Sequence, residues 1–234
     1  MKSEHLRALN TARRERRPAV LVTRHADGEQ RFVSGAEVGA DPFAETLEAA
    51  LRAGKSQTVE IEGAAYFLTV EVPAVRLVMI GAVHISQALA PIARIAGLDP
   101  IVIDPRTAFA SPERFPEIPV LAQWPDEALE AQPLDAFTAI ALLTHDPKID
   151  DRALEPALRA ECFYIGALGS RKTHARRLER MRAEGFDDAA LARIHAPIGL
   201  DIGAVSPAEI AVAICGEIIA AQRKKALRTE KAAL

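Results

Sequence analysis

Two kinds of hydrophobic pattern divide the chain near residue 74. Before that point, short apolar segments alternate with polar residues around hairpin signals at Asp27-Gly28 and Gly63, which predicts antiparallel strands beside amphipathic helices. After it, short apolar strands alternate with segments of 3- and 4-residue periodicity, which predicts βα units in a parallel sheet. We therefore expect a small N-terminal α+β domain at residues 1–74. Residues 75–234 are expected to form a Rossmann-like, doubly wound, mainly parallel α/β domain.

The expected elements follow from these patterns and from turn and capping residues. In the first part, helices are expected over residues 3–17 and 41–54, and strands over residues 19–23, 31–33, 58–61 and 66–72. In the second part, strands are expected over residues 77–80, 101–103, 120–122, 138–143 and 162–165, and helices over residues 85–96, 126–130, 151–160, 170–184 and 188–195. A last helix is expected from Ser206, because Ser206 and Glu209 form a capping box with Pro207 at the first helical position.

The first βαβ unit, from Arg76 to Arg106, has the layout of a dinucleotide-binding fingerprint. Gly81 follows the first strand, and Asp104 ends the second strand about 20 positions later, where an acidic residue binds the ribose in that fold. Val83 and Ser86 replace the second and third glycines of the fingerprint. Two interpretations are open: a modified phosphate or nucleotide site, or an α/β domain that has lost its dinucleotide. Ordinary NAD binding is the less favoured form of the first.

Polar residues follow the carboxyl ends of several predicted strands, which is where ligands bind in open α/β sheets. Asp104 suits a ribose diol by position, although a carboxylate that only caps the strand end is an equal alternative. Arg106 is placed to pair with Asp104 or with a phosphate. His145 follows a buried strand and is either a ligand contact or a structural histidine. The loop at residues 195–203, with two glycines, a proline and an aspartate, is a further candidate to line the crevice.

The turn after the fifth predicted strand, GALGSRKTHARR, places several cations in the first two turns of a helix. Each opposes the helix dipole by about a few tenths of a kcal/mol. Gly166 and Gly169 leave backbone amides accessible and Ser170 caps the helix, so a bound anion would offset the unfavourable charges. We favour Gly169, Ser170 and Arg171 as an anion site. A solvated basic face accounts for the remaining cations, Lys172, Arg176 and Arg177.

Composition and charge exclude other classes of protein. The net charge of -3 gives no dominant basic face for a nucleic acid. Cys162 and Cys215 lack zinc-ligand spacing and lie in apolar segments, which predicts buried thiols. The charged N-terminus is not a signal peptide and the apolar run at residues 208–221 is too short to span a membrane, so a cytoplasmic protein is expected. The sequence shows no Ser-His-Asp set, carboxylate pair or metal cluster.

Four segments together resemble the XdhC/CoxI family of maturation factors for xanthine-dehydrogenase-type molybdenum enzymes. They lie within residues 76–221 and read IGAVHISQALAPIARIAGLDPIVIDPR, THDPKIDD, YIGALGSRKTHARRLERM and ARIHAPIGLDIGAVSPAEIAVAI. The resemblance implies a domain that binds the molybdenum cofactor, as molybdopterin or its cytosine dinucleotide, protects it, supports its sulfuration and delivers it to an apo-enzyme. By position, the implied cofactor-binding residues are Gly81, His84, Ser86, Asp104, Arg106, His145, Gly166, Gly169, Ser170, Arg171, His195, Gly199 and Asp201.

The resemblance also implies partners: an apo molybdenum hydroxylase of the xanthine dehydrogenase type, a sulfur-donating desulfurase, and a second copy of the chain in a homodimer. Two features depart from the family pattern. Val83 stands where family members carry the second glycine of a Gly-x-Gly-His turn. Residues 1–74 lack the Ser-Ser-Pro-Arg-like and triple-glycine motifs of the family's N-terminal domain, which indicates a subgroup with a shortened N-terminal region.

Three functions therefore compete. A cofactor chaperone that is not an enzyme is favoured, and for that reason no catalytic residue and no metal ligand is assigned. An NAD(P)-dependent oxidoreductase is the alternative, against which stand Val83 and the lack of a clear Tyr-Lys proton relay or catalytic cysteine. The third is a regulatory or scaffold protein with a vestigial nucleotide pocket.

Overall fold

The computed structural model describes residues 2–231, with side chains described up to residue 224. The chain divides into two compact units, Met1–Pro73 and Ala74–Leu234. Each unit has its own sheet and its own hydrophobic core. The assignment of residues 1–74 and 75–234 to separate domains stays a prediction.

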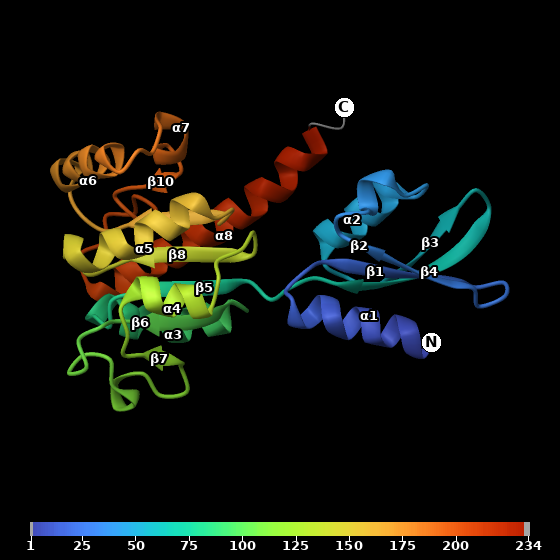
Figure 1. Cartoon of the computed structure of the whole chain (residues 1–234), viewed down its shortest axis with the longest axis horizontal. Helices are drawn as coiled ribbons and strands as arrows, with labels where there is room; N and C mark the ends of the chain where they lie inside the picture. The colour runs from blue at the N-terminus through green and yellow to red at the C-terminus, as the bar shows by residue number, and fades with distance from the viewer. Residues whose placement is uncertain (1, 232–234) are drawn as a thin grey trace. The chain divides into compact units, whose positions relative to one another are not determined.

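In the N-terminal unit, an antiparallel sheet lies between two helices (Figure 1). The strands β1 (Ala19–Arg24), β2 (Gln30–Ser34), β3 (Gln57–Ile61) and β4 (Ala64–Glu71) have the spatial order β2-β1-β4-β3. Helix α1 (Ser3–Arg14) packs with Ala19 and Leu21, whereas α2 (Ala44–Ala53), after the short helix η1 (Val38–Ala40), packs with Val20 and Val22. Successive residues of β1 therefore face different cores, as the two-residue period of a strand requires.

Helix α2 begins later than its sequence signals predicted. The helix was expected from residue 41, because Asp41 and Pro42 are typical of a helix cap and first turn, but its first helical residue is Ala44. The carboxylate of Asp41 instead accepts a hydrogen bond of 2.8 Å from the Phe43 amide and pairs with Arg31 of β2. The ion pair ties this turn to the sheet, so the acidic residue fixes the approach to the helix rather than its cap.

The C-terminal unit holds a six-stranded parallel sheet in the spatial order β10-β9-β8-β5-β6-β7 (Figure 1). Its strands are β5 (Arg76–Ile80), β6 (Asp99–Ile103), β7 (Val120–Leu121), β8 (Thr138–Leu142), β9 (Tyr164–Ala167) and β10 (Ile194–His195). Counted along the chain from β5, the order across the sheet is 3-2-1-4-5-6, which is the order of the doubly wound dinucleotide-binding fold. The predicted Rossmann-like α/β class is confirmed. The order reverses between β5 and β8, which therefore form the switch point.

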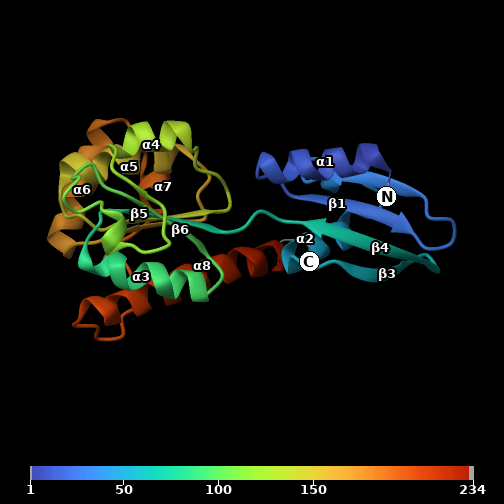
Figure 2. The same cartoon turned by 90° about the horizontal axis from the view of Figure 1, so that it is seen from below.

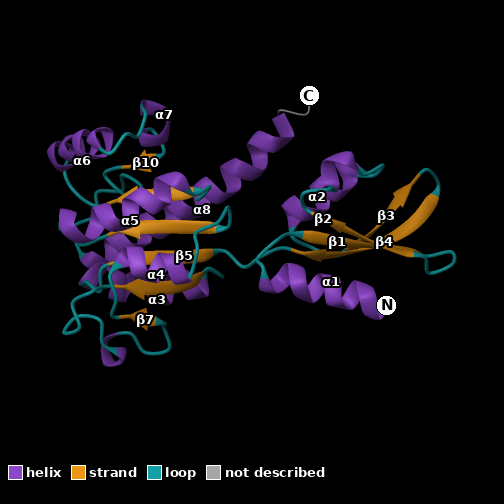
Figure 3. Cartoon of the chain, viewed as in Figure 1, coloured by secondary structure: helices purple, strands orange, loops and turns teal. Residues whose placement is uncertain are grey.

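Helices cover both faces of this sheet (Figures 2 and 3). Helices α3 (His84–Ile95) and α8 (Pro207–Lys231) pack on the face that contains Leu77 and Met79. Helices α4 (Pro125–Ala131), α5 (Pro147–Arg159), α6 (Arg171–Ala183) and α7 (Asp188–Leu191) pack on the face that contains Val78 and Ile80. All residues of β5 and β8 are buried, which explains the apolar runs at residues 77–80 and 139–142.

In the C-terminal unit, the start of α5, the end of α7 and strand β10 differ from the sequence prediction. Helix α5 begins at Pro147 and is capped by Asp146, four residues before the predicted start, so Asp150 lies inside its first turn. Helix α7 ends at Leu191, and the sixth strand β10 follows where helix was expected. Two residues of strand carry no periodicity that a sequence pattern can detect.

Candidate functional site

The turn after β5 lies at the switch point and contains the first glycine of the altered fingerprint. Gly81 has a φ of 111°, and a Cβ there would lie 2.6 Å from Thr144 Cγ2 at the end of β8. Only glycine therefore brings this turn against the neighbouring strand end. Val83 packs its side chain against the α3–α8 core, and helix α3 begins after it with no side-chain cap, leaving His84 exposed in the first helical turn.

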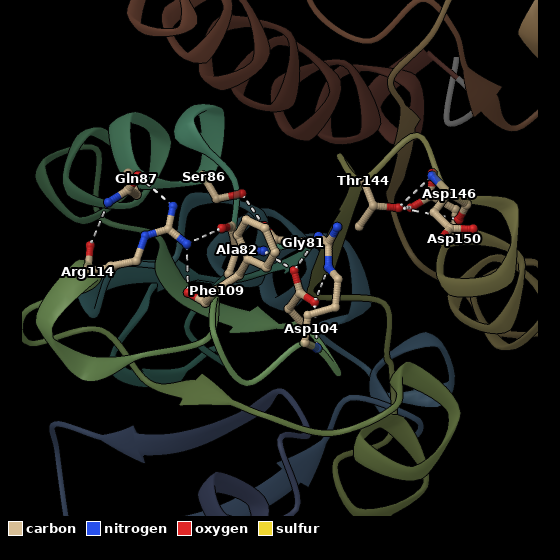
Figure 4. Close-up of polar contacts among 11 residues, drawn as sticks. Gly81, Ala82, Ser86, Gln87, Asp104, Phe109, Arg114, Thr144, Asp146 and Asp150 are labelled. Carbon is tan, nitrogen blue, oxygen red and sulfur yellow. Dashed lines mark hydrogen bonds and ion pairs between the residues drawn. The ribbon is translucent and has the colours of Figure 1, made fainter.

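Asp104, at the end of β6, is fully buried and fixes this turn (Figure 4). Its Oδ2 accepts hydrogen bonds from the Ala82 amide at 2.8 Å and from Arg106 Nη2 at 2.7 Å. Its Oδ1 accepts from the amide and from Nε of Arg106, both at 2.9 Å. Burial opposes ionisation of Asp104, but these hydrogen bonds outweigh it and hold its pKa below the ordinary value. Both oxygens are thus used inside the chain, and the predicted ribose contact stays a prediction that requires Arg106 to move.

Ser86 and Arg114 complete the bracing of the first turn (Figure 4). The buried Ser86 hydroxyl donates to the Gly81 carbonyl. Arg114 Nη1 donates to the Ala82 carbonyl at 2.9 Å, and its Nη2 donates to Gln87 at 2.9 Å. The amide and the carbonyl of Ala82 are therefore both bonded. Sequence reasoning missed Arg114, which lies in the irregular connection between β6 and β7 and carries no motif.

The end of β8 has a second network. Thr144 Oγ1 donates to Asp150 Oδ1 at 2.7 Å and accepts from the Asp146 amide at 3.0 Å (Figure 4). His145 is exposed and has a φ of 64°, a left-handed conformation that non-glycine residues adopt at a cost of about 1–3 kcal/mol. Asp150 is buried, and burial raises the pKa of its carboxyl group. The strained histidine thus lies in the turn between β8 and α5, five residues before the buried acid.

The turn after β9 leads into α6. Gly169 has a φ of 132°, and Ser170 caps the helix by accepting a hydrogen bond of 3.2 Å from the Thr173 amide. Arg171 is exposed at the first helical position. The predicted cap is thus present, and anion binding at this turn stays a prediction.

Arg177, by contrast, does not belong to a solvated basic face. It is 2% exposed, and its Nη2 donates to the Leu168 carbonyl at 2.9 Å and lies 3.9 Å from Asp150 Oδ2. Its Nε and Nη1 are buried without a hydrogen-bond partner. Burial lowers the pKa of Arg177. The predicted place of this residue on the solvated face was wrong.

A cavity of about 270 Å³ lies beside Arg177, between α5 and α6. It is lined by His145, Pro147, Asp150, Thr173, Arg176, Arg177 and Arg180. Arg180 forms a bidentate pair with Asp151, with Nε–Oδ2 2.5 Å and Nη2–Oδ1 3.0 Å. This pair spans the two helices and helps to set the cavity's width.

The loop after β10 is held by Glu217 of α8. Glu217 Oε2 accepts from the buried Tyr164 hydroxyl at 2.5 Å and from the Gly199 amide at 2.7 Å, and Oε1 lies 3.1 Å from His195 Nδ1. The loop also covers Gly166, where a Cβ would lie 2.5 Å from Ile198. Asp201 is exposed. His195 and Gly199 are thus brought together through a carboxylate that sequence reasoning missed, because Glu217 lies inside a helix and belongs to no motif.

The predicted site residues lie at or after the carboxyl ends of parallel strands, which meet at one edge of the sheet. Direct contacts join them in smaller groups: Ser86 with Gly81, Asp104 with Arg106, and His195 with Gly199 through Glu217. The side chains of His84, His145, Ser170, Arg171, His195 and Asp201 are exposed at that edge. This edge of the sheet therefore carries exposed polar side chains next to hydrogen-bonded groups that are buried.

Three further findings limit the chemistry. Cys162 and Cys215 are buried, as predicted, and burial raises the pKa of the Cys162 thiol to about 11. Among the described residues, no group of three or more His, Cys, Asp or Glu side chains is arranged to hold a metal ion. Within residues 2–231, no helix is long and apolar enough to cross a membrane.

A parallel sheet in this order, with a glycine turn at its switch point, defines a Rossmann-type unit whose fingerprint turn is altered. The chain belongs to the XdhC family: the XdhC Rossmann domain matches residues 77–218. The resemblance inferred from the four sequence segments is confirmed.

Known relatives extend this assignment. The chain is 34% identical over 158 residues to the uncharacterized protein YqeB of Escherichia coli, covering 65% of the chain and 28% of YqeB. It is 30% identical over 146 residues to the molybdenum cofactor insertion chaperone PaoD of Escherichia coli, covering 62% and 40%. It is 30% identical over 156 residues to a probable xanthine dehydrogenase subunit of Bacillus subtilis, covering 66% and 45%. The chain thus spans less than half the length of these curated relatives.

A crystal structure described as a xanthine dehydrogenase from Bacillus halodurans has a similar fold. Its TM-score is 0.67 at 22% identity, covering 98% of this chain and 68% of that one. At this identity the likeness supports the fold alone.

Proposed function

We propose that this protein binds the molybdenum cofactor and acts as a chaperone that assists its maturation and its insertion into a xanthine-dehydrogenase-type molybdenum hydroxylase. The relative PaoD, named as an insertion chaperone, and the XdhC Rossmann domain support this function. The chain acts as a carrier in this proposal, so it needs no catalytic residue of its own. A cytoplasmic site of action belongs to the same proposal.

The observation that carries the proposal is the state of the switch point. In a dinucleotide-binding fold the acid after the second strand binds the ribose. Here Asp104 is buried and bonded through both oxygens to Ala82 and Arg106. The position of the second fingerprint glycine is filled by Val83, which packs against the core. These features disfavour an ordinary NAD(P) site, while the uncapped start of α3 still attracts an anion.

The residues present fit a pterin that carries a phosphate or a nucleotide. Glycines in left-handed conformations at positions 81 and 169 allow a ligand to approach the backbone closely. Buried Arg177 nitrogens without partners lie behind the same edge of the sheet. When bound, the cofactor would supply the hydroxylation chemistry of the recipient enzyme. The residues of this chain would hold it, orient it and exclude water until transfer.

The direct test is to purify the protein from cells that make the cofactor and to measure bound pterin and molybdenum. Pterin with molybdenum supports the proposal. Bound NAD(P) would support the oxidoreductase instead, and a protein that carries no ligand after purification from such cells would favour the vestigial scaffold. The exact form, molybdopterin or its cytosine dinucleotide, follows from mass spectrometry of the released pterin.

The recipient hydroxylase, a sulfur-donating desulfurase and a homodimer form the partner side of the proposal. Pull-down of a co-expressed apo-hydroxylase tests the first, and the same assay with a cysteine desulfurase tests the second. Sedimentation equilibrium tests the third, since a dimer would have twice the mass of 25.2 kDa.

Arg171→Ala is expected to lower pterin retention about threefold to tenfold, because an exposed charge-assisted contact to the ligand would be lost. The free energy of unfolding should change by no more than about 0.5 kcal/mol, since the side chain is exposed. Arg182→Ala is the matched control: it lies in the last turn of the same helix and pairs with Asp188. Equal retention in both variants would rule out anion binding at the start of α6.

A further inference from the structure

The cavity between α5 and α6 contains a charged side chain whose hydrogen bonding is incomplete. Arg177 Nε and Nη1 carry three N–H groups between them, and none has a partner in the protein. A buried polar group left without a partner costs about 1–3 kcal/mol, and more when it is charged. The residue is 2% exposed, so bulk water does not relieve this cost. The cavity that it lines is the place from which a partner would come.

The charges around the cavity favour an anion. Arg180 is neutralised by its bidentate pair with Asp151. Arg176 is exposed at the rim, and Arg177 lies at the inner wall. The opposing charge is Asp150, and burial raises the pKa of this carboxyl group. Arg176 and Arg177 thus line the cavity against one carboxyl group.

The size of the cavity limits the ligand. About 270 Å³ is below the range of roughly 300–1,000 Å³ that holds a drug-sized molecule. It suits a single tetrahedral oxyanion or the phosphate end of a larger ligand that extends past His145 to the exposed edge of the sheet. Thr173 lines the same wall, and its hydroxyl lies 3.0 Å from Ser170 Oγ.

We propose that this cavity is a phosphate subsite in which Arg177 donates to the phosphate oxygens and Arg176 closes over them. The phosphate belongs either to the proposed cofactor or to free phosphate. The inference rests on the proposed function only in the first case. A phosphate here would give Arg177 the charge-assisted bonds that the protein itself leaves unmade.

The first test is titration of the full chain with inorganic phosphate by calorimetry, with chloride at the same ionic strength as reference. Arg177→Met is expected to weaken phosphate binding about tenfold or more, because it keeps the apolar stem and removes the donors. Asp150→Asn is expected to strengthen binding severalfold, because it removes the opposing charge and retains an oxygen that accepts from Thr144. Arg182→Met is the control on the same helix and should bind like the wild type.

A structural role for Arg177 predicts a different pattern. Arg177→Met also removes the bond to the Leu168 carbonyl and the charged neighbour of Asp150, so a lower melting temperature is expected in either case. A purely structural role leaves the phosphate affinity of the folded variant unchanged. The double variant Asp150→Asn with Arg177→Met removes both buried charges and tests binding even if the single Arg177 variant is unstable. Wild-type protein that binds no phosphate, or binding that persists in the double variant, would overturn the proposal.

A second experiment identifies the source of the phosphate. Protein purified from cofactor-producing cells is assayed for pterin with and without competing phosphate. Pterin that is lost in Arg177→Met and displaced by phosphate assigns the subsite to the cofactor. Pterin retained equally by both proteins, with phosphate binding still dependent on Arg177, assigns it to free phosphate. Wild-type protein without pterin contradicts the proposed function but leaves the phosphate titration decisive for the cavity.

Discussion

Replacing Asp104 with alanine is expected to lower the free energy of unfolding by about 3 kcal/mol, one of the two largest effects of a single substitution that we expect. The carboxylate accepts four hydrogen bonds, and its removal leaves the buried Ala82 amide without a partner. The Arg106 side chain is 35% exposed, so water can hydrogen-bond to its guanidinium group in the variant. The loss of unfolding free energy therefore stays below that expected for a fully buried ion pair. The β5 turn would lose the contact that joins it to β6.

Urea unfolding followed by the fluorescence of Trp124 measures this effect. Trp124 is the only tryptophan and belongs to the C-terminal unit, so its signal follows that unit. Asp99→Ala is the matched control, because Asp99 begins the same strand and is exposed. If Asp104→Ala lowers the free energy of unfolding no more than Asp99→Ala does, Asp104 does not stabilise the β5 turn.

The same substitution has a defined pH dependence. The pKa of Asp104 lies below its ordinary value of about 4, so the folded state favours the ionised form. Its stabilising contribution is therefore fully present above about pH 4 and is lost as the pH falls through the lower folded pKa. The difference in free energy of unfolding between the wild type and Asp104→Ala should be constant near neutral pH and decrease in acid. A difference that grows below pH 4 would contradict this assignment.

The sequence allowed the fold to be predicted because each strand of the parallel sheet except β10 is an apolar run that ends near a turn or polar residue. The central strands β5 and β8 are buried on both faces. Strands in that environment need apolar side chains at successive positions, as at residues 77–80 and 139–142. Strand β10 contains two residues and pairs only with β9, so its position depends on tertiary packing. The cap of α5 was present in the sequence as Asp146-Pro147, but Asp150 and Asp151 offered equal signals.

The site was less predictable, because sequence position does not show which polar groups satisfy one another. Asp104 stands where the ribose acceptor of a dinucleotide-binding fold belongs. Both of its carboxylate oxygens, however, accept hydrogen bonds from Arg106, two residues later. Arg177 was assigned to a solvated face because α6 is basic throughout. Its spacing of four from both Thr173 and Met181 placed it on the inward face, since Met181 is buried. That spacing was the available signal.

Replacing Glu217 with alanine is the second substitution expected to lower the free energy of unfolding by about 3 kcal/mol. Glu217 joins three elements, because it accepts from Tyr164 of β9 and from the Gly199 amide and contacts His195 of β10. Its loss leaves the Tyr164 hydroxyl, in a residue that is 1% exposed, without its acceptor. The loop that covers Gly166 would lose its anchor to α8, and exposed Asp201 would move with it.

A double-mutant cycle with Tyr164→Phe isolates this network, again with Trp124 fluorescence. Tyr164→Phe alone should cost about 1 kcal/mol, and the pair should cost less than the sum of the two, because the hydroxyl and its acceptor leave together. Glu209→Ala, which removes the exposed capping-box acceptor of the same helix, is the control and should add its effect independently. Strict additivity of the Tyr164 and Glu217 variants would contradict the shared bond.

Acid conditions separate this carboxylate from the one beside the phosphate cavity. Burial opposes ionisation of Glu217, but hydrogen bonds involving His195, Tyr164 and Gly199 hold its pKa below the ordinary value. Its contribution is therefore present above about pH 4 and lost as the pH falls further. Asp150 has a raised pKa, so its contribution is present below about pH 4 and is lost as the pH rises through the folded pKa.

The free energy of unfolding, measured against pH, should therefore respond differently in the two variants. Glu217→Ala should reduce its fall in acid, whereas Asp150→Asn should raise it toward neutral pH. Equal changes of the stability curve in both variants would show that Glu217 and Asp150 are not in the opposite environments described.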